Sequence, residues 1–503
     1  MSEIFETLSP IKQGIALAKE KKFDEAIKVF KKLHVQDRRD VDVLHNLAMC
    51  YIQVDDFDTA IEFFHKAIKL DPRRVESLYA LGSAYLNMHK PKDAVEYFQR
   101  AYVYGFQKEL MLYREWAKAY RILGDFTMAE DVLLKGYRVD RNSEIILALA
   151  VLKKYKTDEH RLLPEIERQM AAKRLPYFVV VRLLFAKAKI CRDLKKYDEA
   201  FESYIKANNL LMPKIVEEDL SEVVQIVDFT RHVFTPSYIQ KMSAHGLPDA
   251  KPIFIVGTPR SGTTLTERII ASHSLVTAGG EQSFMEKAFN SVGDFHLLSR
   301  RKIRQMASMY IKSMRSLYPN PSPFITDKMP SNSFLVGLIK IMFPNAVVIH
   351  CRRHPLDACV SMYFQHFKNM RTYYSDFRAM AIYYKKYAQI MKIWDERFEP
   401  GTIYHNYYEK MVNEPEIYSR KLIDACGLEW QEQCLDYHKQ KGSVHTASVW
   451  QVRQPVYKGS LFSHKKYEKF LTPLQVWLEE EIAEYEALLQ LPQMPIGLSS
   501  DNA

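Results

Sequence analysis

Residues 252–273 read PIFIVGTPRSGTTLTERIIASH and decide the fold of the second half of the chain. Their first part, up to Val256, is a short apolar run rich in β-branched residues, which is typical of a buried parallel strand. A loop of glycine, arginine and hydroxyl residues follows, and apolar residues then recur at helical spacing from Leu265 onward. The order of strand, loop and helix predicts a phosphate-binding loop, because the loop N–H groups and the positive end of the helix both face an anion.

The loop has its glycines, Gly257 and Gly262, at the separation found in nucleoside-triphosphate loops, but no lysine follows the second glycine. Thr263 stands in its place, and Arg260 supplies the cation of the loop. The sequence therefore disfavours magnesium-assisted triphosphate chemistry, although Thr263 or Thr264 could still meet a metal ion. An ordinary strand-to-helix turn is the simpler alternative, and the combination of glycines, an arginine and hydroxyl side chains argues against it.

A second stretch, VVIHCRRHPLDACVS at residues 347–361, predicts a strand, a basic turn and a helix that Pro355 opens. Arg352 and Arg353 stand at the end of the predicted strand, where they form either a second anion site or a solvated surface. Two anion sites in one α/β domain support each other, which favours the first interpretation.

The sequence PRSGTTL after an apolar strand resembles the 5′-phosphosulfate loop of the sulfotransferase family, whose donor is 3′-phosphoadenosine 5′-phosphosulfate (PAPS). Glu281, in GGEQSF, lies 21 residues beyond Arg260, and this spacing makes the chain most similar to tyrosylprotein sulfotransferases and to bacterial sulfotransferases fused to tetratricopeptide repeats. The 3′-phosphate site of the family is an arginine followed eight residues later by a serine, a spacing that Arg353 and Ser361 match. Many members carry an aspartate after this arginine, and His354 is a departure from that pattern.

The resemblance also implies the roles of single residues. Lys328, in ITDKMP, would lie against the sulfate and its leaving group, and the stretch YYEKMVNEP at 407–415 resembles an element that reaches the nucleotide. The stretch SVWQVRQPVYKGS at 448–460 resembles a late loop that closes over the cofactor. The implied catalytic residues are Glu281, Lys328 and Arg260, and the implied cofactor-binding residues are Arg260, Ser261, Gly262, Thr263, Thr264, Arg353, Ser361, Tyr408, Ser448, Gln451, Lys458, Gly459 and Ser460.

These residue types suit sulfuryl transfer by in-line displacement. Negative charge develops on the oxygen that leaves with the phosphate, and fixed cations such as Arg260 and Lys328 stabilise it. The incoming hydroxyl must lose a proton, which a carboxylate such as Glu281 can accept as general base. Structural alternatives are a solvated loop carboxylate for Glu281 and a surface lysine for Lys328. Cytosolic relatives use a histidine as base, so His273 and His350 are further candidates for the base. His273 ends the predicted helix after the loop, where an imidazole commonly caps backbone carbonyls, and this structural role explains it better.

The first half of the chain repeats every 34 residues, with Gly14, Ala48 and Gly82 in one column of small residues. The other columns are Leu17, Tyr51 and Tyr85; Ala26, Ala60 and Ala94; Phe30, Phe64 and Phe98; and Leu33, Ala67 and Ala101. The pattern returns around Ala117 and Ala188. It resembles the tetratricopeptide repeat family over residues 7–211, which implies a solenoid of helix pairs whose concave face binds a peptide or a partner domain. The alternative is that the array only packs on the rest of the chain.

Together the patterns predict an N-terminal α-solenoid of tetratricopeptide repeats, followed by an α/β domain with a parallel sheet and a phosphate-binding loop. The expected domains are the solenoid at 1–211, a helical connector at 212–250, the PAPS-dependent sulfotransferase domain at 251–492 and a tail at 493–503. The connector ends in a boundary rich in proline and glycine.

Composition narrows the functional classes further. The 503 residues are 47% hydrophobic, which excludes a mostly disordered chain, and the net charge of +10 suits an anionic partner. No basic run or nucleic-acid module is visible, so nucleic acid is not an expected partner. The six cysteines form no C-x-x-C pair, and neither a signal peptide nor an apolar run long enough to span a membrane is visible. The cytoplasm is therefore the expected location.

The sequence thus predicts a PAPS-dependent sulfotransferase without a metal. The acceptor is a hydroxyl of a peptide or protein tyrosine, a carbohydrate or a small phenol, and a peptide or protein is the expected partner of the repeats. One alternative is a repeat-based protein-binding scaffold with a degenerate nucleotide-binding domain. Another is a magnesium-dependent kinase, for which Asp327 is the one nearby carboxylate after a predicted strand.

Overall fold

The computed structural model describes residues 9–172, 174–211, 217–318, 321–366, 372–439, 449–455 and 458–490. These residues form two compact units, the first holding the described chain up to Lys153 and the second the described chain from Lys154 onward. Ser448 and the expected tail at 493–503 lie outside the described residues. Within the described chain, no helix is both long and apolar enough to cross a membrane.

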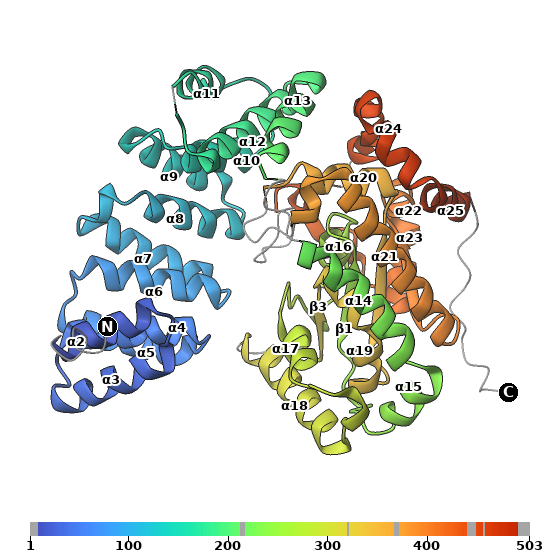
Figure 1. The fold of residues 1–503 in the computed structure, drawn as a ribbon, viewed down its shortest axis with the longest axis horizontal. Coiled ribbons are helices and arrows are strands. Elements are labelled where there is room, and N and C mark those ends of the chain that lie inside the picture. The colour runs from blue at the N-terminus through green and yellow to red at the C-terminus, as the bar shows by residue number, and fades with distance from the viewer. Residues whose placement is uncertain are drawn as a thin grey trace. The chain divides into compact units, whose positions relative to one another are not determined.

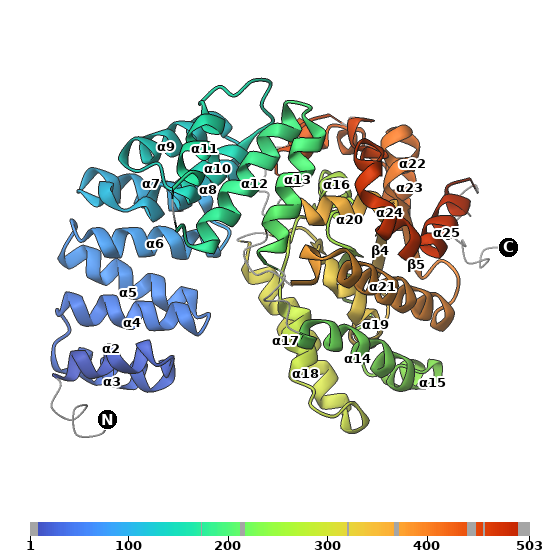
Figure 2. The ribbon, with the colours of Figure 1, turned by 45° about the horizontal axis from the view of Figure 1, so that its top comes forward.

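The first unit consists of helices that stack one after another, as Figures 1 and 2 show from α2 to α9. Consecutive helices pack against each other in pairs, as the repeat predicts. The helices are α2 (Pro10–Lys19), α3 (Phe23–Gln36), α4 (Val41–Gln53), α5 (Phe57–Leu70), α6 (Val75–Asn87), α7 (Pro91–Val103), α8 (Leu110–Leu123), α9 (Phe126–Val139) and α10 (Ser143–Leu152).

The small and aromatic columns of the repeat meet inside each helix pair. A Cβ atom on Gly14 would lie 2.6 Å from the ring of Phe30, and one on Gly82 would lie 2.8 Å from the ring of Phe98. Both phenylalanines are completely buried. The glycines are therefore needed for close approach of the two helices, because a methyl group at either position would overlap a ring that has no room to move.

The second unit is built on five parallel strands in the order β2-β3-β1-β4-β5. The strands are β1 (Ile253–Gly257), β2 (Val276–Thr277), β3 (Phe324–Asp327), β4 (Val347–Arg352) and β5 (Ile403–Tyr407). The helices are α11 (Leu162–Met170), α12 (Tyr177–Asp193), α13 (Tyr197–Asn209), α14 (Glu217–Val233), α15 (Pro236–Ser243), α16 (Thr263–Ile270), α17 (Phe284–Asn290), α18 (Arg300–Ser316), α19 (Val336–Met342), α20 (Pro355–Tyr363), α21 (Phe377–Arg397), α22 (Tyr408–Asn413), α23 (Pro415–Ala425), α24 (Glu468–Trp477) and α25 (Glu479–Gln490). The predicted parallel sheet with a loop after its first strand is confirmed.

Helices cover both faces of the sheet, and alternate residues of β1 reach each face. Ile253 and Ile255 join a buried cluster with residues of α16 and α23. Phe254 points to the other face, where its ring lies 5.7 Å from that of Tyr310 in α18 and 6.3 Å from that of Phe343 after α19. All five residues of β1 are buried, as expected for a continuous apolar run in a parallel sheet.

Helices expected outside the α/β domain also pack in this second unit. Phe201 of α13 stacks on Phe470 of α24 with ring centroids 4.5 Å apart, and Asn208 donates a hydrogen bond of 3.1 Å to the carbonyl of Tyr363. In the predicted connector, α14 packs on α21, and the ring of Phe234 lies 5.6 Å from that of Trp394. The last repeat helices and the connector thus share the core of the second unit.

Candidate active site

After each of the five strands, one predicted site residue lies within four residues of the strand's end. Arg260 follows β1, Glu281 follows β2, Lys328 follows β3, Arg353 follows β4, and Tyr408 follows β5. Because the strands are parallel, their carboxyl ends share one edge of the sheet. β1 lies between β3 and β4, so the chain order reverses there, and such a switch point is where α/β sheets bind ligands.

The loop after β1 has the tight geometry of an anion cradle. Gly262 precedes α16 with φ +98°, and a Cβ atom there would lie 2.6 Å from the Tyr408 ring. Arg260 also has a positive φ of +71°, a conformation that costs energy in any residue with a side chain. The buried Ser261 hydroxyl donates a hydrogen bond of 2.8 Å to the Thr258 carbonyl. Of the other predicted loop residues, Thr263 and Thr264 open α16 and are buried.

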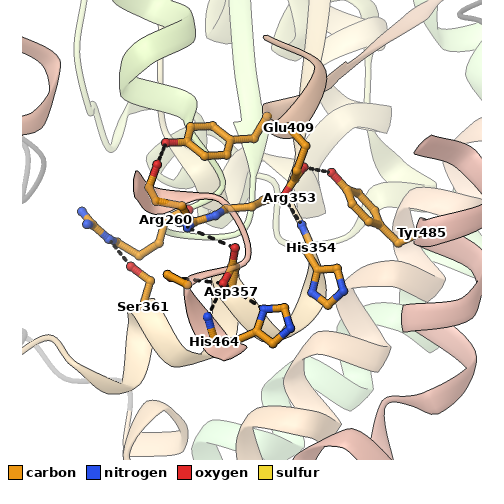
Figure 3. A network of polar contacts seen from close by, with 11 residues as sticks. Arg260, Arg353, His354, Asp357, Ser361, Glu409, His464 and Tyr485 are labelled. Carbon is orange, nitrogen blue, oxygen red and sulfur yellow. Dashed lines mark hydrogen bonds and ion pairs between the residues drawn. The ribbon is translucent and has the colours of Figure 1, made fainter. Parts of the chain in front are cut away.

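The loop and the segment after β4 meet, as Figure 3 shows. Arg260 Nε donates a hydrogen bond of 2.9 Å to Ser361 Oγ, and Arg353 NH1 donates one of 3.1 Å to the Arg260 carbonyl. The Arg353 guanidinium lies 4.8 Å from the centre of the Tyr408 ring, and its NH2 donates a hydrogen bond of 2.8 Å to the Ser460 carbonyl. The Tyr408 and Ser460 hydroxyls are 2.7 Å apart. The structure therefore brings these five predicted residues together.

Arg352, the neighbour of Arg353, points elsewhere. Its guanidinium lies over the rings of Tyr407 and Tyr485, and it forms an ion pair of 3.5 Å with Glu484. The eight-residue spacing to Ser361 thus selected the arginine that contacts the loop.

Glu281 and Lys328 form a separate ion pair at the same edge. The Lys328 side chain is fully buried, whereas the Glu281 side chain is 39% exposed. The Lys328 ammonium contacts the Glu281 carboxylate. The pair therefore places a proton acceptor that solvent reaches beside a cation that solvent does not.

Glu267, in α16, supports this pair and was not predicted. Its Oε1 accepts a hydrogen bond of 2.9 Å from the Gly280 N–H and one of 2.8 Å from the Thr326 hydroxyl. The Gly280 carbonyl in turn accepts a hydrogen bond of 2.8 Å from the Lys328 N–H. Glu267 thereby ties the loop that carries Glu281 to β3. In the sequence it looks like an ordinary helix residue, so no signal could have found it.

A buried polar network beneath Arg353 was also missed (Figure 3). The His354 N–H donates a hydrogen bond of 3.0 Å to Glu409, and the Tyr485 hydroxyl donates to the other oxygen of that carboxylate. The His354 ring stacks on the His464 ring with centroids 4.5 Å apart. Burial raises the pKa of Glu409, and burial together with the neighbouring His464 lowers the pKa of His354. The fifth member, Asp357, stands four residues after Arg353, a helical spacing that the sequence does display.

The two histidines considered as alternative bases are engaged elsewhere. His273 Nε2 lies 2.8 Å from the Glu429 carbonyl, and its Nδ1 accepts a hydrogen bond of 3.2 Å from the Leu275 N–H. His350 is buried, 2.5 Å from the Tyr387 hydroxyl and 3.0 Å from His405. Burial and the neighbouring His405 hold the pKa of His350 well below its ordinary value.

Asp327, the carboxylate that a kinase would need, is enclosed. It is completely buried and accepts hydrogen bonds of 2.7 Å from the Tyr310 hydroxyl and 3.2 Å from the Asn332 amide. Burial raises the pKa of Asp327 to about 7. Both of its oxygens already have protein partners.

The late loop reaches the site only in part. Ser460 contacts Arg353 and Tyr408, whereas Lys458 and Gly459 are exposed in the same short 3₁₀ helix, Lys458–Ser460. Gln451 lies in the 3₁₀ helix Gln451–Arg453, and its buried Oε1 has no hydrogen-bond partner among the described residues.

The residues present fit a donor with two anionic groups. Among the described residues, Nε of Arg353 is buried without a hydrogen-bond partner, so this guanidinium keeps a donor for a further acceptor. Gly262 lets the Tyr408 ring pack directly against the loop, since a Cβ atom there would lie 2.6 Å from that ring. Residues 260–264 would hold one anionic group, and Arg353, Ser361 and Ser460 would hold the other.

The chain is similar to several known proteins. An uncharacterized protein of Aquifex aeolicus (strain VF5) is 33% identical over 399 residues, which are 76% of this chain and 52% of that protein. A putative protein-tyrosine sulfotransferase of Caenorhabditis briggsae is 22% identical over 198 residues, which are 38% of this chain and 70% of that protein. A crystal structure of MamA has 19% identity and a TM-score of 0.28, covering 38% of this chain and 93% of that one. The chain spans about half the length of the Aquifex relative.

Three family models match. Residues 19–101 match the model described as anaphase-promoting complex, cyclosome, subunit 3, and residues 181–210 match a tetratricopeptide repeat. Residues 252–432 match the sulfotransferase family, and this range contains the loop, the Glu281–Lys328 pair, Arg353 and Tyr408. The C-terminal half of the chain therefore carries a sulfotransferase-family domain, and its N-terminal half carries tetratricopeptide repeats.

Proposed function

We propose that this protein transfers a sulfuryl group from PAPS to an acceptor hydroxyl, with Glu281 as general base. One observation carries the proposal. Arg260 and Arg353, which the family resemblance assigns to the two phosphate groups of the donor, come together through the hydrogen bond of Arg260 to Ser361 and that of Arg353 to the Arg260 carbonyl. The sulfotransferase-family match over residues 252–432 supports the same chemistry.

On the donor side, Arg260 and the N–H groups of the loop would hold the 5′-phosphate. Bound PAPS supplies the sulfuryl group, and its bond to the 5′-phosphate oxygen breaks as a bond to the acceptor oxygen forms. The buried ammonium of Lys328 would stabilise the negative charge that develops on the leaving oxygen, and a fixed cation in a water-excluded position does so strongly.

On the acceptor side, Glu281 would take the proton of the incoming hydroxyl. Its carboxylate contacts Lys328 and is partly exposed, so an acceptor can approach it from solvent. The base and the cation thus lie within one contact of each other, as a reaction between the two substrates requires.

The acceptor that we favour is a tyrosine of a peptide or protein. This choice is supported by the similarity to a putative protein-tyrosine sulfotransferase and by the tetratricopeptide repeats, which commonly bind extended peptides. A carbohydrate or a small phenol is the alternative that an acceptor screen would separate. We also propose the cytoplasm as location, supported by six cysteines that are all unpaired and buried.

The first experiment is a thermal-shift panel on the full chain with 3′,5′-adenosine bisphosphate, PAPS, Mg-ATP and Mg-GTP. A ligand at 100 times its dissociation constant stabilises a protein by about 2.7 kcal/mol, which such a panel detects. We expect selective stabilisation by the bisphosphate and by PAPS, and its loss in Arg353→Ala.

Arg352→Ala is the matched control, because this neighbouring arginine contacts Tyr407, Tyr485 and Glu484 instead of the loop. It should lower the melting temperature of the free protein but keep the shift on adding the bisphosphate. Stabilisation by Mg-ATP with none by the bisphosphate would reject the sulfotransferase proposal in favour of a kinase.

A further inference from the structure

Asp357 lies beside the proposed 3′-phosphate site without being one of its predicted ligands. It is completely buried in the first turn of α20. Its Oδ1 accepts hydrogen bonds of 2.8 Å from the His464 N–H, 3.0 Å from His464 Nδ1 and 3.2 Å from the Ser463 hydroxyl. Its Oδ2 lies 3.5 Å from NH2 of Arg353 (Figure 3). One carboxylate therefore contacts both an arginine of the site and a segment more than a hundred residues later.

That later segment is the direct continuation of the late loop. Ser463 and His464 begin the 3₁₀ helix Ser463–Tyr467, three residues after Ser460. The Ser460 carbonyl itself accepts a hydrogen bond of 2.8 Å from Arg353 NH2. Arg353 and Asp357 thus hold this part of the chain through hydrogen bonds at two neighbouring points, Arg353 at Ser460 and Asp357 at Ser463 and His464.

The Arg353 guanidinium is held from several directions at once. The Arg260 carbonyl accepts a hydrogen bond from NH1, and the Ser460 carbonyl accepts one from NH2. The Tyr408 ring covers the face of the guanidinium, and the Asp357 carboxylate lies beside NH2. A guanidinium recognises phosphate through a rigid planar fork, so its affinity depends on orientation as well as on charge. Contacts that fix this plane therefore decide how well Arg353 can receive a phosphate.

The carboxylate is ionised despite its burial. Burial opposes the ionisation of Asp357, but the hydrogen bonds from His464 and the charge of Arg353 outweigh it and hold the pKa of the carboxyl below its ordinary value. A buried negative charge would repel a phosphate that it touched. Asp357 is therefore suited to act through Arg353 and the late segment, and not as a ligand of the donor.

We propose that Asp357 is a positioning residue for donor recognition: by holding the Arg353 fork and the 460–464 segment in one arrangement, it makes binding depend on the 3′-phosphate. The inference rests on the proposed function, because it assumes that Arg353 receives that phosphate. The inference goes beyond the proposed function, because it assigns the discrimination between donors with and without a 3′-phosphate to Asp357, a residue that does not contact the donor.

The test compares the dissociation constants of 3′,5′-adenosine bisphosphate and 5′-AMP by calorimetry on the full chain. We expect the wild type to prefer the bisphosphate. In Asp357→Asn, which keeps the shape of the side chain but removes its charge, affinity for the bisphosphate should fall about tenfold, because the Arg353 guanidinium loses the ion pair that helps to fix its orientation and contacting residues are coupled to about this extent. Affinity for 5′-AMP should stay at the wild-type value, because that ligand places no phosphate on Arg353.

Two further variants separate positioning from folding. His464→Gln removes the ring donor to Asp357 but leaves the carboxylate beside Arg353, so the preference should fall in the same direction by a smaller factor. Asp376→Asn changes a carboxylate that caps α21 through the Ala379 N–H, away from Arg353, and should keep the full preference. If Asp357→Asn does not fold, His464→Gln carries the test.

The outcomes are distinguishable. A wild type that binds both nucleotides equally would reject the proposed function itself. A wild type that prefers the bisphosphate, with variants that keep this preference or lose affinity for both nucleotides equally, would overturn the role of Asp357 and leave the proposed function standing.

Discussion

The Glu281–Lys328 ion pair joins a buried cation of the candidate site to a carboxylate that reaches solvent. The Lys328 side chain is fully buried, and its ammonium contacts the Glu281 carboxylate. Breaking a buried ion pair by removing one partner costs about 3–5 kcal/mol, and less where one partner reaches solvent, as Glu281 does. The proposed base therefore has a second role, because it also stabilises the cation that would meet the leaving oxygen.

Substitution of Glu281 tests both roles. Glu281→Gln keeps the size of the side chain and can still accept a hydrogen bond from Lys328, but it cannot take a proton. We expect kcat for sulfuryl transfer to fall by about 10²–10⁴, the usual contribution of a general base. The dissociation constant of 3′,5′-adenosine bisphosphate should not rise, because the change removes a negative charge near an anionic ligand.

The matched control is Glu286→Gln, an exposed carboxylate in the next helix, α17. It should leave kcat unchanged. A Glu281→Gln enzyme that turns over at the wild-type rate would exclude Glu281 as the base, and the search for a proton acceptor would have to start again among other groups at this edge.

The helix pair is the scale at which the N-terminal repeats are stabilised. The first three pairs each bury one phenylalanine, Phe30, Phe64 or Phe98, and a glycine faces the ring in two of them, Gly14 opposite Phe30 and Gly82 opposite Phe98. Gly82 faces Phe98 in the pair α6/α7, where a Cβ atom would lie 2.8 Å from the ring and 3.2 Å from the Ala94 carbonyl. Packing and helix propensity therefore make opposite predictions at this position.

Gly82→Ala decides between them. Propensity alone would stabilise α6 by about 1 kcal/mol. We expect overlap with the buried Phe98 ring to win, because overpacking a closed core costs about 1–3 kcal/mol, and the melting temperature should fall. Asn87→Ala, at an exposed position of the same helix, is the control and should not lower it. A rise in the melting temperature of Gly82→Ala would mean that the pair can open to admit a methyl group.

At the scale of the whole molecule, the sequence predicts what short patterns encode and misses what distant segments build. The 34-residue period and the strand–loop–helix motif predict both halves of the fold, and fixed spacings predict Arg353 and Ser361. The hydrogen bond between Asp357 and His464 joins residues 107 positions apart, and the one between Asn208 and Tyr363 joins residues 155 positions apart. No local pattern carries such pairings, because they arise only when separate elements pack.

The division into two compact units predicts which helices and strands a bound donor analogue protects from amide exchange. All described contacts of the proposed donor site lie in the second unit, which has its own core. A bound ligand opposes only those opening reactions that disrupt its site, so a saturating donor analogue should protect the second unit alone. With 3′,5′-adenosine bisphosphate at 100 times its dissociation constant, amide exchange measured by mass spectrometry should slow by up to about 100-fold in β1, the loop after it and α20. Exchange in α2 to α7 should not change. Equal protection of those repeat helices would show that the two units open as one, and that occupancy of the donor site is coupled to the repeats.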